Sequence, residues 1–372
     1  MTHETSILEI IEKTTARRNA RRSFMKTAVG GAAAVGGLSL LAACGDDDAM
    51  STPFPTPTPT PTPAAVSTDV AVLNFALNLE YLEAQFYSYA AFGTGLPAAS
   101  LTGTGTPGAV VTGMGAGFPR AVDFSGDPLI GQYAREIAYD EIAHVNFLRT
   151  ALGSAAVAQP AIDISGTPTG AFSAAARAAG VITGASATFD PYLNPTNFLL
   201  GAYIFEDIGV TAYKGASPVI SAMYLEAAAG ILAAEAYHAG LVRTILYARG
   251  VTNRDLITAA QQISDLRDAA DGTATGTLAG GTTPTAGSPS PDGTAASAGD
   301  TDQGIGGTNI GVLATGVSNI VPTDVNGLAY SRTTQQVHNI AYLNATGANR
   351  TRGGFFPAGT NNPNPAFTVG LG

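Results

Sequence analysis

The sequence lacks tryptophan altogether and contains a single cysteine, Cys44, among its 372 residues. One cysteine excludes an intramolecular disulfide, so burial and polar contacts must hold the fold. Charged residues make up only 12% of the chain, and acidic residues outnumber basic ones, which gives a formal net charge of −10. This deficit of positive charge argues against nucleic acid as the main partner and against adsorption to an anionic membrane surface.

Apolar residues and glycine are what the chain has in quantity. Hydrophobic residues account for 45% of the sequence, which is enough for a sizeable core. The 45 glycines cluster in a few stretches instead of spreading evenly. We therefore predict a compact core interrupted by long flexible insertions.

The first 44 residues have the organisation of an export signal. A twin arginine followed by Ser-Phe-Met-Lys (21–26) precedes an apolar stretch of small residues (28–43) that is short for a spanning helix. The arginine pair resembles the bacterial twin-arginine signal, and Leu-Ala-Ala-Cys (41–44) resembles a lipoprotein cleavage site. We predict export by the twin-arginine route and membrane attachment only through lipidated Cys44, with an ordinary secretory signal as the alternative.

A Pro/Thr-rich linker, 45–66, follows the signal. Its Pro-Thr repeats over 51–63 cannot form helix or sheet and favour an extended polyproline conformation. Such a spacer holds the next domain away from the bilayer. We therefore expect a lipid-anchored protein of the periplasm or cell envelope.

Four stretches have the apolar spacing of long helices. They cover 68–90, 127–153 (opening with Asp-Pro), about 197–214, and 217–250 (opening with Ser-Pro). Thr68 or Asp69 can cap the first helix, and a cap followed by proline is a typical start for the second and fourth. The fourth stretch is apolar nearly all round, which predicts burial on every side.

The connections between these helices are uneven. Residues 91–126 are predicted to be a Gly/Thr/Pro-rich surface loop, and 153–196 a long link with a short helix near 171–179. A turn of two or three residues joins the third and fourth helices, which must then be antiparallel neighbours. The predicted fold is all-α, a four-helix bundle over 67–250 with one long crossover.

The rest of the chain is predicted to add three segments to this bundle. A short helix occupies 251–271, and a low-complexity linker covers 272–318. The C-terminal segment, 319–372, contains a last helix at 331–344 and an apolar run at 353–357 that can dock on the bundle.

Glutamates after residue 44 are few, and all lie in the predicted bundle helices: Glu80, Glu83, Glu136, Glu141, Glu206, Glu226 and Glu235. Two histidines follow a glutamate by three residues, in Glu141-Ile-Ala-His144 and Glu235-Ala-Tyr-His238. Residues three apart on a helix point to the same side, so each pair can reach one ion together. An unpaired ionised carboxylate at the apolar position of Glu235 would be costly, and a divalent cation removes that cost.

Two such helices and one glutamate from each of the other two make a cage for two divalent ions. The predicted ligands are Glu80, Glu141, His144, Glu206, Glu235 and His238. Mixed carboxylate and imidazole donors favour iron first and manganese second, while zinc and copper are allowed by affinity. Glu83 competes with Glu80 for its role, either as an extra ligand or as a group beside the ligands.

An internal repeat relates the helices in pairs. Tyr87 and Tyr213 each follow a predicted ligand glutamate by seven residues. This pattern predicts a pseudo-twofold arrangement with one half-site on each helix pair. We interpret the tyrosines as core aromatics, with contact to the ligands or redox activity as the alternative.

Arginines complete the repeat. Arg149 and Arg243 each follow a predicted ligand glutamate by eight residues, and we expect them to pair with carboxylates such as Glu136 or Asp140. His338 is expected to be an ordinary helix residue, and Glu226 to face solvent.

These motifs together resemble a known family. The stretches 78–87 (Asn-Leu-Glu-Tyr-Leu-Glu-Ala-Gln-Phe-Tyr), 140–144, 205–213 and 234–238 are similar to those of bacterial and plant ferritin-like domain proteins, sometimes called desiccation-related. The resemblance covers about 68–250, and 330–356 also resembles the family's C-terminal segment. It implies a ferritin-like bundle with the same six residues at metal-ligand positions. The insertions and the lipid anchor argue against a 24-subunit cage, while smaller oligomers stay open.

Two hypotheses of function follow. The first is an exported two-metal oxidoreductase acting on oxygen or peroxide, as a ferroxidase, a peroxidase or a manganese catalase-like enzyme. The second is a non-catalytic protein of the envelope that protects against stress or desiccation. A third, a substrate-oxidising enzyme, requires an apolar pocket beside the metal site.

Overall fold

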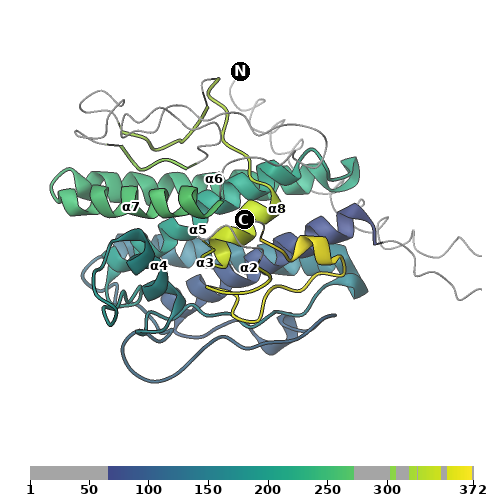
Figure 1. Cartoon of the computed structure of the whole chain (residues 1–372), viewed down its shortest axis with the longest axis horizontal. Coiled ribbons are helices and arrows are strands. Elements are labelled where there is room, and N and C mark those ends of the chain that lie inside the picture. Colours follow the sequence, from purple (N-terminus) through teal and green to yellow (C-terminus); the bar gives the residue numbers. More distant parts are fainter. Residues whose placement is uncertain (1–65, 272–301, 307–317, 325, 345–349, 371–372) are drawn as a thin grey trace, which may run out of the picture. The chain divides into compact units, whose positions relative to one another are not determined.

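The computed structural model describes residues 66–271, 302–306, 318–324, 326–344 and 350–370 (Figure 1). All of them belong to the second of two units of the chain, Ala64–Gly372. The predicted signal, all but the last residue of the predicted linker and most of the low-complexity stretch lie outside the described residues. The described residues form helices and isolated β-bridges but no strand. None of their helices is both long and apolar enough to cross a membrane.

Four long helices form the bundle (Figure 1): α2 (Thr68–Phe92), α3 (Pro128–Leu152), α5 (Pro195–Ala216) and α6 (Ala222–Gly250). α2 packs along α3, and α5 packs along α6. The connection from α3 to α5, 153–194, is the single long crossover. The all-α bundle with one long crossover is therefore confirmed.

Local chemistry sets the ends of the first helix. The Ser67 hydroxyl accepts a backbone hydrogen bond at 3.2 Å and caps α2, so the cap precedes the expected Thr68 or Asp69 by one or two residues. Gly93 ends the helix with a φ of 76°, a left-handed conformation that a side chain would strain.

The start of the fourth helix differs from the prediction. α6 begins at Ala222, because residues 217–221 form the connection from α5 instead of its first turn. The N–H of Ser221 donates to the Asp69 carboxylate at 2.8 Å, which fixes this connection to the first helix. The connection therefore has five residues and not two or three.

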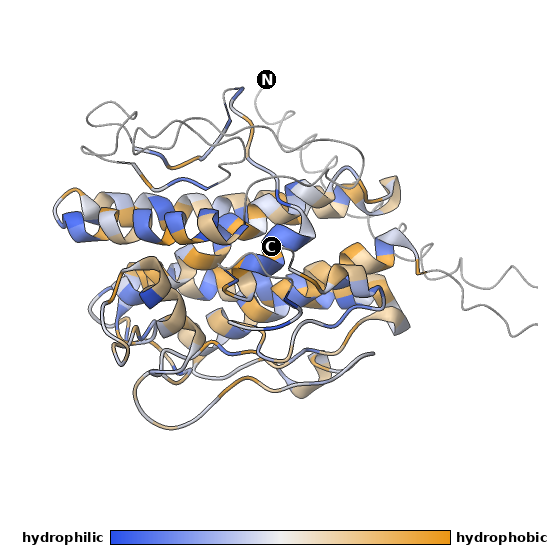
Figure 2. Ribbon diagram, viewed as in Figure 1, coloured by the Kyte–Doolittle hydropathy of each residue, from blue (hydrophilic) through white to orange (hydrophobic). Residues whose placement is uncertain are grey.

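The helices buried on all sides are α2 and α5, and not α6 as predicted. One face of α6 is open to solvent, where Tyr237 is 79% exposed and Met223 is 59% exposed. Further segments cover the outer sides of the inner helices: α7 (Arg254–Asp271) and α8 (Thr334–Ala341) contact α5, and η3 (Pro365–Phe367) contacts α2. Figure 2 shows that α7 carries many more hydrophilic residues than α6.

The α2–α3 loop and the crossover are tied to each other. Isolated parallel bridges join Thr104 to Val157 and Val110 to Ile162. The side chain of Asn74 in α2 accepts a hydrogen bond from the Val157 N–H at 2.9 Å, which anchors this pair of segments to the bundle. The crossover also carries α4 (Ala171–Ala179), where the sequence predicts a short helix.

The C-terminal segment packs on the bundle through aromatic rings. Phe355 is 1% exposed, and its ring centroid lies 4.9 Å from that of Phe205 and 5.3 Å from that of Phe172. α8 is shorter than the predicted helix at 331–344. Residues 302–306, inside the stretch predicted as a low-complexity linker, are buried.

A buried network of ion pairs attaches these covering segments to the bundle. Arg243, Arg267 and Arg332 pair with Asp207, Asp271 and Asp302 at 2.6–2.8 Å. All six side chains are at most 7% exposed. The network joins α5, α6, α7, residues 302–306 and the start of α8, and the mutual pairing offsets the cost of burying each charge.

Candidate metal centre

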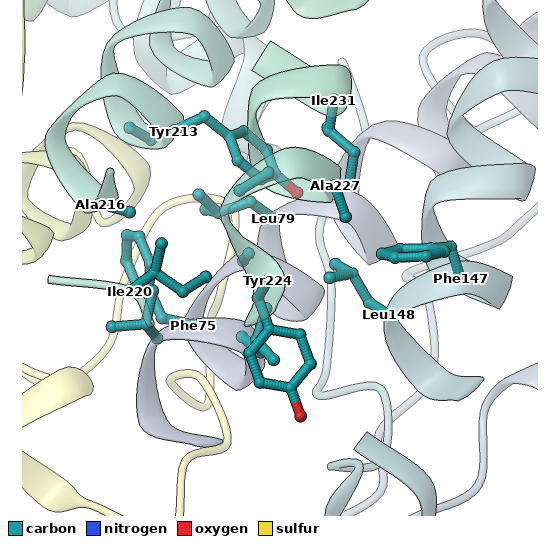
Figure 3. A pocket seen from close by; sticks show the side chains of 15 residues that line it. Phe75, Leu79, Phe147, Leu148, Tyr213, Ala216, Ile220, Tyr224, Ala227 and Ile231 are labelled. Carbon is teal, nitrogen blue, oxygen red and sulfur yellow. The ribbon is translucent and has the colours of Figure 1, made fainter. Parts of the chain in front are cut away.

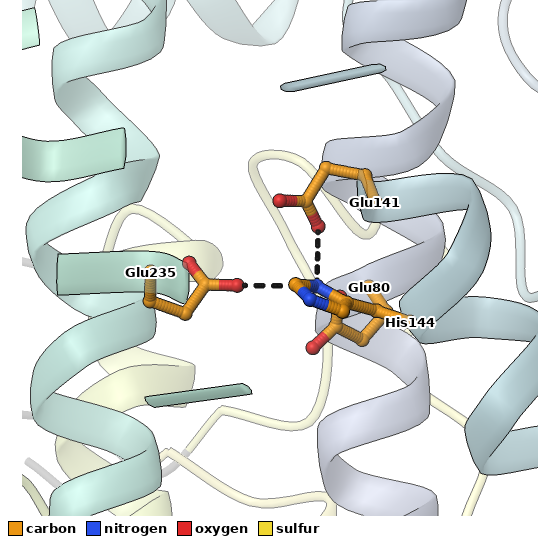
Figure 4. Close-up of side chains that lie close together, drawn as sticks. All are labelled: Glu80, Glu141, His144 and Glu235. Atoms are coloured by element: carbon orange, nitrogen blue, oxygen red, sulfur yellow. Dashed lines mark hydrogen bonds and ion pairs between the residues drawn. The ribbon is translucent and has the colours of Figure 1, made fainter. Parts of the chain in front are cut away.

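The six predicted ligands converge inside the bundle, and we call them the Glu/His cluster: Glu80 from α2, Glu141 and His144 from α3, Glu206 from α5, and Glu235 and His238 from α6. All are buried, with exposures from 0% to 9%. Figure 4 shows four of these side chains pointing toward one another from three helices. Residues three apart on α3 and on α6 share a face, which is why each Glu-His pair enters the same space.

The first half of the cluster surrounds His144. Its Nδ1 lies 3.2 Å from Glu80 Oε2, 3.4 Å from Glu141 Oε2 and 3.5 Å from Glu235 Oε1. One ligand atom from each of these four residues lies within 4.8 Å of all the others. Four donors at this spacing can bind a common ion.

The second half surrounds His238. Its Nδ1 lies 3.1 Å from Glu141 Oε1 and 3.6 Å from Glu206 Oε2. Ligand atoms of Glu206, Glu235 and His238 also lie within 4.8 Å of one another. Glu141 and Glu235 therefore take part in both halves.

Several donor atoms of the cluster are buried without a hydrogen-bond partner: Glu141 Oε1, Glu206 Oε2, Glu235 Oε2 and His238 Nδ1. His238 Nδ1 and Glu141 Oε1 approach to 3.1 Å but do not align as a hydrogen bond. Buried polar atoms are nearly always bonded, so donors that converge on shared space without bonding one another fit bound cations. Four carboxylates and two imidazoles suit iron or manganese.

Electrostatics favours protons on both imidazoles when no cation is bound. Burial alone would lower the pKa of His144, but Glu80 and Glu141 raise it to about 11. The pKa of His238 is raised to about 9 against burial, by the close approach of the Glu141 carboxylate and by the charge of Glu206. Each ring must lose a proton before it can bind an ion.

The carboxylates divide into two types. Burial raises the pKa of Glu80 to about 7 and that of Glu206 to about 8. It also raises the pKa of Glu235, with repulsion from Glu141 adding to the effect. Burial acts on Glu141 too, but the two imidazoles close to its oxygens overcome this effect and hold the Glu141 pKa well below its usual range. The cluster is thus centred on one ionised carboxylate shared by its two halves.

Two tyrosine hydroxyls contact the cluster. Tyr87 donates to Glu206 Oε1, and Tyr213 donates to Glu80 Oε1. Each tyrosine therefore contacts the glutamate of the other inner helix, not the one seven residues before it. The rings of Tyr87 and Tyr213 are buried in the core, as the sequence predicts. Their hydroxyls also contact the predicted ligands, which was the alternative interpretation.

Asp140 and Glu83 differ in how they relate to the cluster. Asp140 Oδ2 lies 3.2 Å from His238 Nε2 and can orient that ring from outside. Glu83 is 6% exposed, has no hydrogen-bond partner at Oε2 and stays outside the groups of converging donors. Burial and then repulsion from Glu141 raise the Glu83 pKa well above its usual value. Glu80, and not Glu83, contacts His144.

The predicted carboxylate partners of the two arginines, Glu136 and Asp140, are wrong. Arg149 donates instead to the Tyr81 hydroxyl of α2 at 2.6 Å and to the Thr102 carbonyl, and this second bond holds the α2–α3 loop. Arg243 pairs with Asp207 at 2.6 Å. Eight residues exceed two helical turns, which carries both arginines past the cluster and into contact with the covering segments.

His338 and Glu226 lie where the sequence suggests. His338 is a buried residue of α8, with Nδ1 2.9 Å from the Thr334 carbonyl and Nε2 3.0 Å from the Thr360 hydroxyl. Burial lowers its pKa to about 4. Glu226 is exposed.

Sequence reasoning missed Gly209, which lies in α5 against the cluster. A Cβ at this position would lie 2.2 Å from Glu235 Oε2. The sequence did contain a signal, since this glycine lies in the middle of a long predicted helix, three residues after Glu206. Glycine destabilises a helix there, so its presence indicates that another group approaches the backbone closely.

Comparison with known proteins agrees with this architecture. Residues 68–248 match the family model of the ferritin-like domain. The desiccation-related protein PCC13-62 of Craterostigma plantagineum is 32% identical over 208 residues, or 54% of this chain and 62% of that protein. The ferritin-like catalase Nec2 of Nesocodon mauritianus is 26% identical over 183 residues, or 49% of this chain and 54% of that protein.

These matches cover only part of the length of each relative. The chain spans less than two thirds of the length of either relative. No solved structure matches the chain. The predicted ferritin-like class of the bundle is confirmed over the helices that carry the Glu/His cluster.

Proposed function

We propose that this chain, whose residues 68–248 form a ferritin-like domain, is an exported two-metal protein that performs redox chemistry on oxygen or peroxide or oxidises iron. The observation that carries the proposal is the convergence of buried donor atoms that have no hydrogen-bond partner. Similarity to a ferritin-like catalase supports a redox activity. Iron is the first choice of metal and manganese the second.

The six residues of the Glu/His cluster would hold the two ions, and Glu141 and Glu235 contact residues of both halves. When bound, the ions would supply electrons for the reduction of oxygen or peroxide. The protein keeps bulk water out through burial and fixes the outer carboxylates through Tyr87 and Tyr213. Glu83, whose pKa burial raises well above its usual value, can hold a proton near the cluster.

Metal loading tests this proposal directly. The full chain, reconstituted anaerobically with ferrous iron or with manganese and then desalted, should bind about two ions per chain. Glu141→Gln should lower this below about one, because the substitution removes a charged donor from both halves. Glu226→Gln, the same change at an exposed carboxylate, should load as the wild type does. Fewer than about one ion per wild-type chain, measured by elemental analysis, would contradict the proposal.

Similarity to a desiccation-related protein supports a second candidate, a protective envelope protein that uses the bundle without metal chemistry. The double variant Glu141→Ala, His238→Ala removes donors from both halves and separates the two functions. If this variant loses metal but still protects dried cells, the second candidate holds. Joint loss of metal and protection favours the first.

The export route and the lipid anchor belong to the same proposal. Replacing both Arg21 and Arg22 by lysine should block export by the twin-arginine route. Cys44→Ser should release the exported protein from the membrane fraction. A Cys44→Ser protein that stays in that fraction would show that another feature attaches it.

A further inference from the structure

A small apolar cavity lies in the interior of the bundle, between all four of its helices. Its volume is about 20 Å³. Figure 3 shows the side chains around it, which include Leu79, Phe147, Tyr213, Tyr224 and Ile231. Every lining residue is an alanine, an aliphatic residue or an aromatic one.

The cavity lies next to the Glu/His cluster along the bundle axis. Each helix that lines it carries a cluster residue close by in sequence: Ala76 precedes Glu80 by four residues, Phe147 follows His144 by three, and Ile231 precedes Glu235 by four. Three to four residues are one helical turn, an axial distance of about 5.4 Å. The cavity is therefore about one turn away from the cluster on three helices.

Tyr213 from the fourth helix connects the cavity with the cluster. Its ring lines the cavity, and its hydroxyl donates to Glu80 Oε1. The opposite side of the cavity is formed by the half-buried residues Tyr224, Ala216 and Ala227 near the α5–α6 connection. From that end to Tyr213, which contacts Glu80, every residue that lines the cavity is aliphatic or aromatic.

Size and lining determine what this cavity can hold. About 20 Å³ has room for only one or two small molecules, which excludes an organic substrate of ordinary size. Apolar cavities of this kind stay dry and take up apolar gases. Peroxide would lose most of its hydrogen bonds here, because every lining side chain except those of Tyr213 and Tyr224 is a hydrocarbon.

We propose that this cavity is the binding site and access path for dioxygen, which reaches the Glu/His cluster from the α5–α6 end of the bundle. The inference rests on the proposed function and narrows its co-substrate to oxygen. Peroxide, if used, must enter elsewhere.

Xenon binding to the metal-free protein tests the cavity without any activity. We expect a saturable xenon shift in ¹²⁹Xe NMR that Ala227→Leu abolishes, because the larger side chain fills the cavity. Ala229→Leu, the same change at an exposed position two residues along α6, should leave the shift intact. Wild-type protein that binds no xenon would overturn the inference.

Reaction rates test the access path. In the iron-loaded protein, Ala227→Leu should slow oxidation by oxygen at least about fivefold and leave oxidation by peroxide unchanged within about twofold. An unchanged oxygen rate, or equal slowing with both oxidants, would overturn the inference. Protein that holds no iron would instead overturn the proposed function, and xenon binding would still decide whether the cavity takes an apolar gas.

Discussion

At the scale of single residues, each of the two outer carboxylates of the cluster, Glu80 and Glu206, accepts a tyrosine hydroxyl at one oxygen and faces an imidazole with the other. Glu80 receives the Tyr213 hydroxyl at Oε1 and presents Oε2 to His144 at 3.2 Å. Glu206 receives the Tyr87 hydroxyl at Oε1 and presents Oε2 to His238 at 3.6 Å. A carboxylate fixed in this way can turn its second oxygen to an ion without having to be ordered first.

Tyr213→Phe should therefore weaken metal binding while the bundle stays folded. The ring remains in the core, but Glu80 loses the donor that orients it, and we expect about a tenfold loss of affinity. Competition with a chelator at fixed pH measures this change. Tyr237→Phe, which removes a hydroxyl from a residue that is 79% exposed, is the matched control. Equal affinities of the two variants would exclude an orienting role for the hydroxyl.

Metal binding should release protons, and affinity should rise with pH. The pKa values of His144 and His238, about 11 and about 9, mean that both rings are protonated at pH 7 and must lose a proton to bind an ion. The raised pKa of Glu206 adds to the protons released. Calorimetry in two buffers of different ionisation enthalpy should report about two or more protons per chain at pH 7. Binding that does not depend on pH between 6 and 9 would contradict this prediction.

Sequence spacing was sufficient to place each Glu-His pair because the arrangement of such a pair is local, whereas Glu80 and Glu206 were assigned from the known pattern of two-metal bundles. A Glu-x-x-His pair shares a helix face whatever surrounds it, so the spacing of Glu141 and His144 alone places them together. The partner of Arg149 could not be placed in this way, because Tyr81 meets it across the bundle and no periodicity encodes that contact.

At the scale of elements, apolar composition alone did not identify the inner helices. α6 is apolar nearly all round, yet its outer face carries exposed Tyr237, while α2 and α5 are covered by segments far away in the sequence. Which helix lies inside depends on where α7, α8 and the tail dock. That docking is set by long-range pairs such as Arg267 with Asp302.

Gly209 gives a prediction at this scale, because α5 can approach Glu235 only where it has no side chain. Gly209→Ala should keep the fold, since the atom in its way is the flexible end of Glu235, but it should displace that carboxylate and lower metal content. Gly230→Ala in α6 meets nothing within 4 Å and should stabilise the protein by about 0.5–1 kcal/mol. Thermal unfolding and elemental analysis of both variants measure these effects. Full metal content in Gly209→Ala would show that Glu235 is not needed as a ligand.

At the scale of the whole molecule, stability should fall in mild acid because of His338. Its pKa is about 4 when folded, against an ordinary value of 6.5, so the unfolded chain binds more protons between these values. The neutral His338 ring therefore adds about 3 kcal/mol to the free energy of unfolding above pH 6.5, and this contribution is lost as the pH falls toward 4.

Denaturant unfolding at pH 7, 5.5 and 4 measures this loss. His338→Gln removes the titrating ring, so its free energy of unfolding should depend less steeply on pH than that of the wild type. Parallel pH profiles of the two proteins would assign the acid sensitivity to other groups.

The fold as a whole was predictable to the level of a four-helix bundle with one crossover, because four long apolar periodicities and the lengths of their connections determine it. Residues 302–306 show where prediction stops. Their composition is that of a linker, and Asp302 is buried only because Arg267 and Arg332 are present to neutralise it.

The contact between the first bundle helix and the tail has a consequence for the order of assembly. Asn78 donates to the Asn361 carbonyl at 2.8 Å and accepts from the Asn361 N–H at 2.9 Å, across 283 positions of the chain. A ribosome delivers Asn361 long after Asn78. Until then the Asn78 side chain has only the Asn74 carbonyl of its own helix as a partner, so the contact between this helix and the tail forms late in the assembly of the domain.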